Sequence, residues 1–191
     1  MTERMNIYIY SKHDEESLKK KSMIEDALIH EGFKMSADHK DANIILSVGS
    51  DGSFLQAVQK TGFRQDCLYA GISVTGKQSL YCDFEYNNLY EMTQTIRNAE
   101  LEVRRYPLLE VTIDEHRPFY CLNEFSIRSN IIRSFVLDVI MDGQLFEVFL
   151  CDGLIIPTPT VSTASNNSVN GAVVDPLLKC YQLTEIARGN S

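Results

Sequence analysis

The sequence predicts an α/β domain followed by an all-β, antiparallel domain, and two observations support this fold class. Apolar strand-like runs alternate with helical stretches from about residue 5 to residue 99, a pattern typical of a parallel sheet with helices on its faces. From residue 102 to 156 the pattern changes to short β-rich runs separated by turn residues, which favours antiparallel strands. We therefore expect a domain at 1–100 and a second at 101–191.

The first domain shows strand and helix signals in regular alternation. Strands are expected over three β-rich runs: 5–10, 43–48 and 67–72. The run 43–48 is apolar almost throughout, as in a strand that is covered on both faces. Helices are expected over three stretches: 15–31, one that starts at Phe54, and 87–99. The first of these ends at Gly32, where glycine accepts the left-handed conformation of a helix end.

The second domain is predicted from its short β runs and the turns between them. The expected runs are 103–106, 108–113, 119–128, 134–141, 145–150 and 154–156. Asp142-Gly143 is a turn signal between two of them. Residues 176–189 predict a terminal helix, with proline near its start and glycine near its end. Sheet edges without partners would then remain, and we expect the chain to self-associate.

Composition excludes several classes of protein. The 191 residues include 18 lysines and arginines against 26 aspartates and glutamates, a formal charge of −8, which disfavours nucleic-acid binding. No apolar run reaches the length of a membrane helix. The five cysteines form no C-x-x-C pair, so neither a zinc site nor a disulfide framework is expected. We therefore expect a cytoplasmic protein that binds neither nucleic acid nor membrane.

The stretch Val48-Gly-Ser-Asp-Gly-Ser53 is the first candidate for chemistry. It follows a buried strand and precedes a helix, where an open α/β sheet binds its ligand. Its glycines let a phosphate approach the backbone, and the helix offers free N–H groups. Asp51 could act as a general base on a hydroxyl or contact a metal held by phosphates. Alternatively, Asp51 or Ser53 only caps the helix.

Two further polar segments could line a site. Asn123 and Glu124 interrupt a β-like run and suit the hydroxyls of a ribose or the edge of a base, although a polar strand face explains them too. Residues 157–171 are almost all small or turn-forming, and Asp152-Gly153 precedes them. This tract is either a flexible linker or the backbone-lined wall of a pocket.

These segments, in this order, resemble the motifs of the NAD kinase family. The stretches that carry the resemblance are Gly49-Ser-Asp-Gly-Ser53, Leu122-Asn-Glu124, Cys151-Asp-Gly-Leu154 and Thr158-Pro-Thr-Val-Ser-Thr-Ala-Ser165. The resemblance covers nearly the whole chain. It implies a two-domain kinase that uses ATP and Mg²⁺ to phosphorylate the adenosine 2′-hydroxyl of NAD, giving NADP, and that forms homodimers or homotetramers.

The resemblance also assigns roles to individual residues. It implies that Asp51 is the base at the 2′-hydroxyl, and no residue is assigned as a metal ligand. The nucleotide-binding residues that it implies are Gly49, Gly52, Ser53, Asn123, Glu124, Asp152, Thr160, Thr163, Ala164 and Ser168. Of these, Asn123 and Glu124 match an NAD-contacting pair, and Asp152 matches a carboxylate near the nicotinamide ribose. Thr160, Thr163 and Ala164 match positions that line the adenine pocket.

The chain departs from the family pattern inside these motifs. The departures are Ser50 for glycine, Leu150-Cys151 for Arg-Gly, Val161 for glycine, Ser165 for tyrosine, Asn167 for lysine and Asn170 for glycine. The family also continues through further strands, so the second domain is expected to be truncated. Side chains where the family has glycine raise the alternative of a degenerate member that binds NAD or NADP and catalyses weakly. An unrelated nucleotide-binding module is a further alternative.

Overall fold

The structure is a computed structural model that describes residues 5–76, 79–98, 101–131, 133–161, 170–175 and 178–186. The chain divides into two compact units, Met1–Val103 and Arg104–Ser191. The strands of the first unit are parallel, and those of the second are antiparallel. The predicted fold class is therefore confirmed.

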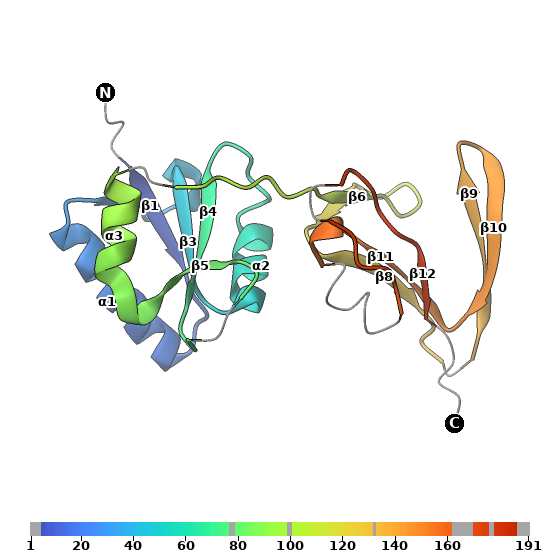
Figure 1. Ribbon diagram of the computed structural model, residues 1–191, viewed down its shortest axis with the longest axis horizontal. Coiled ribbons are helices and arrows are strands. Elements are labelled where there is room, and N and C mark those ends of the chain that lie inside the picture. The colour runs from blue at the N-terminus through green and yellow to red at the C-terminus, as the bar shows by residue number, and fades with distance from the viewer. Residues whose placement is uncertain are drawn as a thin grey trace. The chain divides into compact units, whose positions relative to one another are not determined.

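The described strands of the first unit form one parallel sheet (Figure 1). Their spatial order is β2 (Lys34–Met35), β1 (Asn6–Tyr10), β3 (Ile44–Gly49), β4 (Leu68–Ser73) and β5 (Cys82–Glu85). The middle strand, β3, is buried from Ile44 to Val48, because a parallel strand between two helical layers has no solvent face. β3 and β4 run side by side to the same edge, where Gly49 lies opposite Ser73.

Helices cover both faces of this sheet. They are α1 (Glu15–His30), α2 (Asp51–Lys60) and α3 (Leu89–Asn98). In Figure 1, α1 and α3 lie on one face and α2 lies on the other. Ile24 and Leu28 of α1 and Met92 and Ile96 of α3 join the strands in the hydrophobic core. Two short 3-10 turns precede β3 and α3: η1 (His39–Asp41) and η2 (Tyr86–Asn88).

The second unit is built around β11. The elements at its centre are β8 (Glu124–Arg128), β11 (Gly153–Pro157) and β12 (Thr184–Ile186), and β11 lies between the other two. A separate pair consists of β6 (Leu109–Val111) and β7 (Phe119–Cys121). The 3-10 turn η3 (Pro159–Val161) follows β11. The register of β8 with β11 sets Glu124 opposite Pro157 and Arg128 opposite Gly153.

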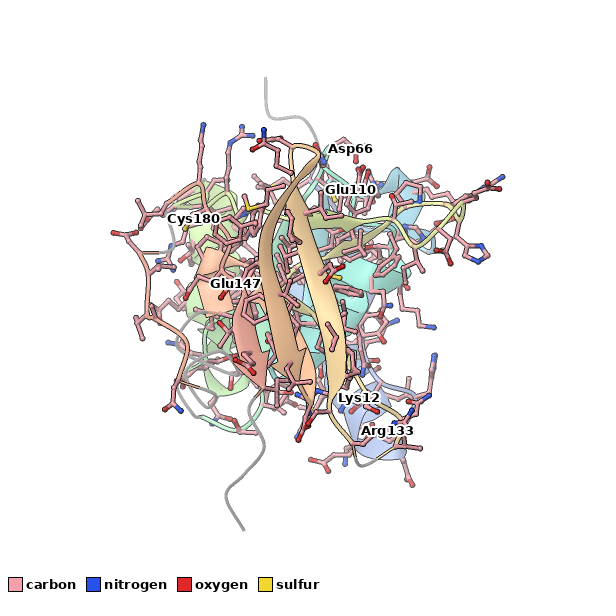
Figure 2. All side chains as sticks on the ribbon, turned by 90° about the vertical axis from the view of Figure 1, so that its right-hand side faces the viewer. Lys12, Asp66, Glu110, Arg133, Glu147 and Cys180 are labelled. Atoms are coloured by element: carbon pink, nitrogen blue, oxygen red, sulfur yellow. The ribbon has the colours of Figure 1, made fainter. Side chains whose placement is uncertain are left out.

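A long hairpin consists of β9 (Phe135–Met141) and β10 (Gln144–Cys151). Its turn residues, Asp142 and Gly143, have φ of 50° and 78°, as in the type I′ turn that matches strand twist. The predicted turn is therefore confirmed. In Figure 2 the hairpin faces the viewer, and Glu147 of β10 is labelled.

Several element predictions need correction. Residues 176–189 are not one helix, because Thr184–Ile186 form β12 and pair with Gly153–Ile155. The backbone groups of that edge of β11 need partners, and the β-branched Thr184 and Ile186 suit a strand. The run 103–106 contains no strand. The run 119–128 is not continuous, because Leu122 and Asn123 separate β7 from β8.

No helix among the residues that the structure describes combines the length and the apolar character needed to cross a membrane.

Candidate active site

The turn between β3 and α2 is the first part of the site. Gly49 has a φ of +143°, and a Cβ at this position would lie 2.9 Å from the Cβ of Ser53. Ser53 is 2 % exposed and accepts the backbone N–H of Ser50 at 3.3 Å. Gly49 is therefore required by the close approach of Ser53, and the Ser53 hydroxyl serves the turn itself.

The helix begins at Asp51, three residues earlier than predicted, so both Asp51 and Gly52 lie in its first turn. The N-cap is Ser50, and Ser53 completes a capping box with it. The interpretation of Asp51 as the cap is therefore wrong, whereas Ser53 does contribute to the cap. In this turn the N–H of Ser50 donates to Ser53 Oγ, and that of Ser53 donates to the carbonyl oxygen of Ser50. Among the described residues, the N–H groups of Asp51 and Gly52 remain at the positive dipole end of the helix. A Cβ at Gly52 would come no nearer than 3.7 Å to its nearest neighbour, Ser50 Oγ. The protein's own packing therefore gives no reason for glycine at position 52.

The carboxylate of Asp51 is bound by the connection between β4 and β5. Oδ1 accepts the hydroxyl of Ser79 and the backbone N–H of Tyr81, the latter at 2.8 Å. Oδ2 accepts the backbone N–H of Leu80 at 3.0 Å. The side chain of Asp51 is thus held by a segment that lies nearly thirty residues later in the chain.

Aromatic packing fixes this segment against α2. The rings of Phe54 and Tyr81 stack with centroids 5.0 Å apart and an interplanar angle of 2°. Phe54 also meets Tyr69 edge-on at 6.2 Å. Phe54 and Tyr81 are 5 % and 3 % exposed, so the contact is a rigid part of the core rather than a surface feature.

Cys82 lies beside Ser79 and Asp51. Burial raises the pKa of its thiol, a hydrogen bond with Ser79 opposes that change, and the charge of Asp51 adds to it. A thiol with a raised pKa is protonated at neutral pH and is a poor nucleophile. Among the described residues of this cluster, the thiol is therefore not the candidate nucleophile.

Sequence reasoning missed the segment 79–81. A usable signal was present, because β3 and β4 are adjacent parallel strands and the loops at their carboxyl ends meet at one edge of a sheet. The predicted strand 67–72 ends at that edge, so the residues after it were candidates to contact the turn 49–53.

In the second unit, the structure brings together two of the predicted segments. The N–H of Thr158 donates to the carbonyl oxygen of Asn123 at 2.7 Å, and its hydroxyl donates to that of Leu122 at 2.9 Å. Glu124 lies opposite Pro157 in the strand register. The Asn123–Glu124 pair and the beginning of the 157–171 tract therefore form one corner, so residues 157–161 are not a flexible linker.

Thr160 is buried at this corner. It belongs to η3 and is 3 % exposed. Within the described residues, its hydroxyl oxygen has no hydrogen-bond partner. A buried polar group normally has a partner, so among the described residues nothing competes with a ligand for the Thr160 hydroxyl. Thr163, Ala164 and Ser168, which were predicted to bind the nucleotide as well, lie outside the described residues.

Asp152 lies at the opposite end of β11 from this corner. The five residues of β11 lie between Asp152 and Thr158, which places the two about 20 Å apart along the strand at about 3.3 Å per residue. Asp152 Oδ1 accepts the hydroxyl of Ser134 at 2.6 Å, and its backbone N–H donates to Ile186. Gly153 is required by packing, since a Cβ there would lie 2.6 Å from the carbonyl oxygen of Ile127.

The departures from the family motifs are compatible with the observed backbone. Ser50 is extended, with φ of −127°, and Val161 is not among the residues with positive φ. Neither position needs glycine for its backbone angles, so backbone strain gives no support to a degenerate member. Asn170 does have a positive φ, of 63°, and asparagine is among the residues that tolerate it best.

Within the ranges that the structure describes, no three His, Cys, Asp or Glu side chains are grouped so that they could hold a metal ion.

Curated relatives match this chain along almost all of its length. A protein named NAD kinase 2 from Bacillus subtilis is 51% identical over 189 residues, which are 99% of this chain and 71% of the relative. A protein of the same name from Oceanobacillus iheyensis is 47% identical over 191 residues, covering 100% of this chain and 72% of the relative. No protein-family model matches the chain.

Solved structures agree with this result. An NAD kinase from Archaeoglobus fulgidus, solved in complex with ATP, has a TM-score of 0.77 and 26% identity, and the match covers 96% of this chain and 72% of that one. A yeast NADH kinase complexed with NADH has a TM-score of 0.73 and 19% identity, and the match covers 98% of this chain and 67% of that one. The latter likeness concerns the fold alone. Identity near one half over essentially the whole chain decides the assignment: the chain belongs to the NAD kinase family.

Proposed function

We propose that this protein transfers the γ-phosphoryl group of ATP to the adenosine 2′-hydroxyl of NAD and so forms NADP. The observation that carries the proposal is the carboxylate of Asp51, which is held in a fixed orientation at the first turn of α2. That turn offers a helix N-terminus and a glycine without a packing role, both of which suit a phosphate. The names of the relatives supply the substrate class.

Asp51 acts as general base in this reaction. As the 2′-oxygen attacks the γ-phosphorus, an oxygen–phosphorus bond forms and the bond to the β-phosphate bridging oxygen breaks. The hydroxyl proton moves to Asp51, and ADP leaves with the electron pair of the broken bond. Positioned general bases typically contribute about 10²–10⁴ in rate.

Mg²⁺ is part of the proposal as the partner of ATP. In enzymes of this kind it is held by substrate phosphates, water and one or two carboxylates, so the phosphates of ATP and water would supply most of its ligands and no acidic cluster is required of the chain. When bound, the ion neutralises charge that develops on the transferred group. The role of the chain's own residues is to orient the hydroxyl and accept its proton.

The test is formation of NADP from ATP and NAD in a coupled assay, beside a calorimetric titration with NAD. Turnover together with binding supports the proposal. Binding without turnover contradicts it and points to the degenerate member, while the absence of both points to an unrelated nucleotide-binding module.

The corner of the second unit is proposed to bind NAD through Asn123, Glu124 and Thr160. Replacing Thr160 with valine preserves its shape and removes the hydroxyl that has no partner within the described residues. We expect the stability of the variant to be unchanged or higher, because an unsatisfied buried polar group is lost. Its affinity for NAD should be lower by about tenfold, which corresponds to the loss of roughly one hydrogen bond.

Denaturant unfolding and calorimetry measure these two effects. Thr158→Val is the matched control, since that hydroxyl donates to Leu122 and its loss should lower stability. Lower stability with unchanged NAD affinity in Thr160→Val would show that this hydroxyl serves the fold.

A cytoplasmic location is proposed from the cysteines. All five are free thiols, and Cys180 is exposed. Exposed thiols persist in reducing compartments.

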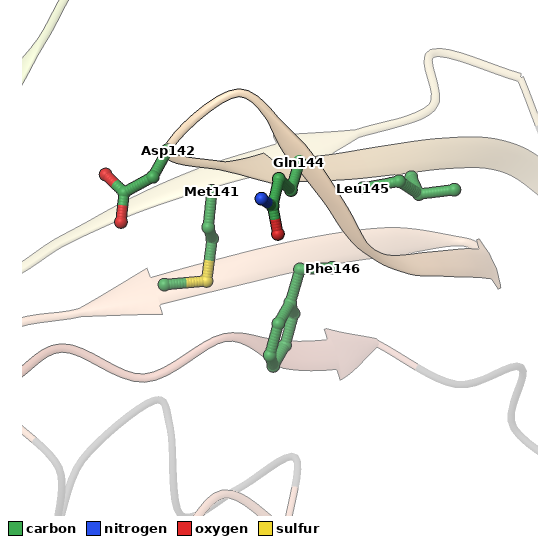
Figure 3. A pocket seen from close by; sticks show the side chains of 5 residues that line it. All are labelled: Met141, Asp142, Gln144, Leu145 and Phe146. Atoms are coloured by element: carbon green, nitrogen blue, oxygen red, sulfur yellow. The ribbon is translucent and has the colours of Figure 1, made fainter.

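We further propose a homo-oligomer that uses the hairpin β9–β10. Apolar residues of one face of this hairpin, here called the hairpin face, are each at least 51% exposed. They are Val136, Ile140, Leu145, Val148 and Leu150. At the tip, a hollow of about 400 Å³ is lined by Met141, Asp142, Gln144, Leu145 and Phe146. Figure 3 shows Met141, Gln144 and Phe146 extending to one side of the tip. Apolar surface gathered in this way marks an interaction site.

The double variant Val136→Lys/Leu150→Glu tests the hairpin face. These residues lie opposite each other, so the new charges attract and preserve the hairpin while the apolar face is interrupted. We expect a smaller species by light scattering than the parent gives. Tyr90→Lys, at an exposed aromatic residue of α3, is the control. An unchanged mass in the double variant, or a parent that is monomeric, contradicts the proposal.

A further inference from the structure

The hydrogen bonds of Asp51 are distributed unevenly between its two oxygens. Oδ1 accepts two donors from the described residues, the Ser79 hydroxyl and the Tyr81 N–H. Oδ2 accepts one, the Leu80 N–H. A carboxylate oxygen has two lone-pair positions for donors. Counting the donors of the described residues alone, Oδ1 is filled and Oδ2 retains one acceptor position.

The two backbone donors are fixed by packing. Tyr81 stacks on Phe54, which belongs to the same helix as Asp51, so the N–H groups at 80 and 81 keep their place relative to the carboxylate. Ser79 differs from them, because its donor is a side chain that a substitution can remove. The Ser79 hydroxyl is therefore the one of these three donors that a substitution can remove without changing the backbone.

We propose that Ser79 is a positioning residue, which holds Oδ1 of Asp51 so that Oδ2 receives the proton of the attacking hydroxyl. This inference rests on the proposed function. The hydroxyl of Ser79 does not touch the substrate in this scheme. It acts as a third restraint, beside the N–H groups of Leu80 and Tyr81, on rotation of the carboxylate about its Cβ–Cγ bond. An aligned base raises the rate of the chemical step more than it raises substrate affinity.

Ser79→Ala is expected to lower kcat by about tenfold, the equivalent of one lost hydrogen bond to a charged group, with KM for NAD within about twofold of the parent. Ser79→Thr keeps the hydroxyl and should restore most of kcat. The control is Ser36→Ala, which removes a serine hydroxyl bound to the carbonyl oxygen of Asp38 in the same unit and should leave kcat unchanged.

A double-variant cycle shows whether Ser79 acts through Asp51. If it does, adding Ser79→Ala to Asp51→Asn lowers kcat no further. The same four proteins are also unfolded with denaturant, which measures the contact without any activity. Independent effects on kcat, or a rise in KM with unchanged kcat, overturn the inference.

Failure of the proposed function would look different. A parent protein that forms no NADP overturns that function, and the unfolding cycle then decides the inference alone. If the changes in unfolding free energy of the two single variants do not add up in the double variant, the hydrogen bond between Ser79 and Asp51 is supported. If they do add up, the inference is overturned.

Discussion

Replacing Asp51 with asparagine is expected to lower kcat for NADP formation by about 10²–10⁴, the usual contribution of a general base. Asparagine has nearly the same shape, but it cannot take the proton of the attacking hydroxyl. NAD affinity should change only modestly, because the predicted NAD-contacting pair, Asn123 and Glu124, is untouched. Steady-state kinetics and calorimetry measure the two effects separately.

The same change also affects the fold. Asp51 uses both oxygens as acceptors, whereas asparagine has an amide nitrogen in place of one of them. That nitrogen would face a donor from Leu80, or from Ser79 and Tyr81, so stability should fall by about 1–3 kcal/mol. Asp26→Asn, at an exposed position of α1, is the matched control. A kcat of Asp51→Asn equal to that of the parent would show that the carboxylate has only a structural role in this turn.

Alanine at Gly49 and alanine at Gly52 should have opposite effects on stability, although the two residues share one turn. Gly49→Ala is expected to destabilise the protein by about 2–5 kcal/mol, because it combines a positive φ with overpacking. The new Cβ would collide with Ser53, which is almost fully buried. Activity is lost along with the fold.

Gly52→Ala should instead stabilise the protein by about 0.5–1 kcal/mol, since alanine is the better helix residue. Its Cβ has room in the protein, with Ser50 Oγ at 3.7 Å, but would lie where a phosphate is proposed to approach the backbone. We expect kcat/KM to fall about tenfold, or about 1.4 kcal/mol. Unfolding curves and kinetics on both variants decide this. Parental kcat/KM in Gly52→Ala would mean that no phosphate comes close to this residue.

The regular parts of the fold were predictable because each has its own local pattern. The apolar run 43–48 had to be a central strand, and Asp142-Gly143 had to turn a hairpin. β12 was not predictable in this way. Its residues, Thr184–Ile186, are a strand because β11 needs a partner, and the helical pattern of 176–189 carries no information about that distant edge.

The site was predictable only in part, for the same reason. Asp51, Asn123 and Glu124 are candidates predicted from motifs, and the order of the motifs indicated the family. The hold on Asp51 comes from Ser79, Leu80 and Tyr81, and two of these donors are backbone N–H groups. A backbone donor leaves no trace in residue type, so only the three-dimensional course of the chain reveals it.

The position of β12 has a consequence for the dynamics of the second unit. β12 pairs with β11 through only Gly153–Ile155, and the chain between the two strands is long. Such a non-local edge forms late in folding and opens readily in the native state. Opening of β12 alone would release the amide of Asp152, which donates to Ile186, while β8 stays paired with β11. Amide hydrogen exchange should therefore be faster at Asp152 than at the β8 and β11 amides that bond each other.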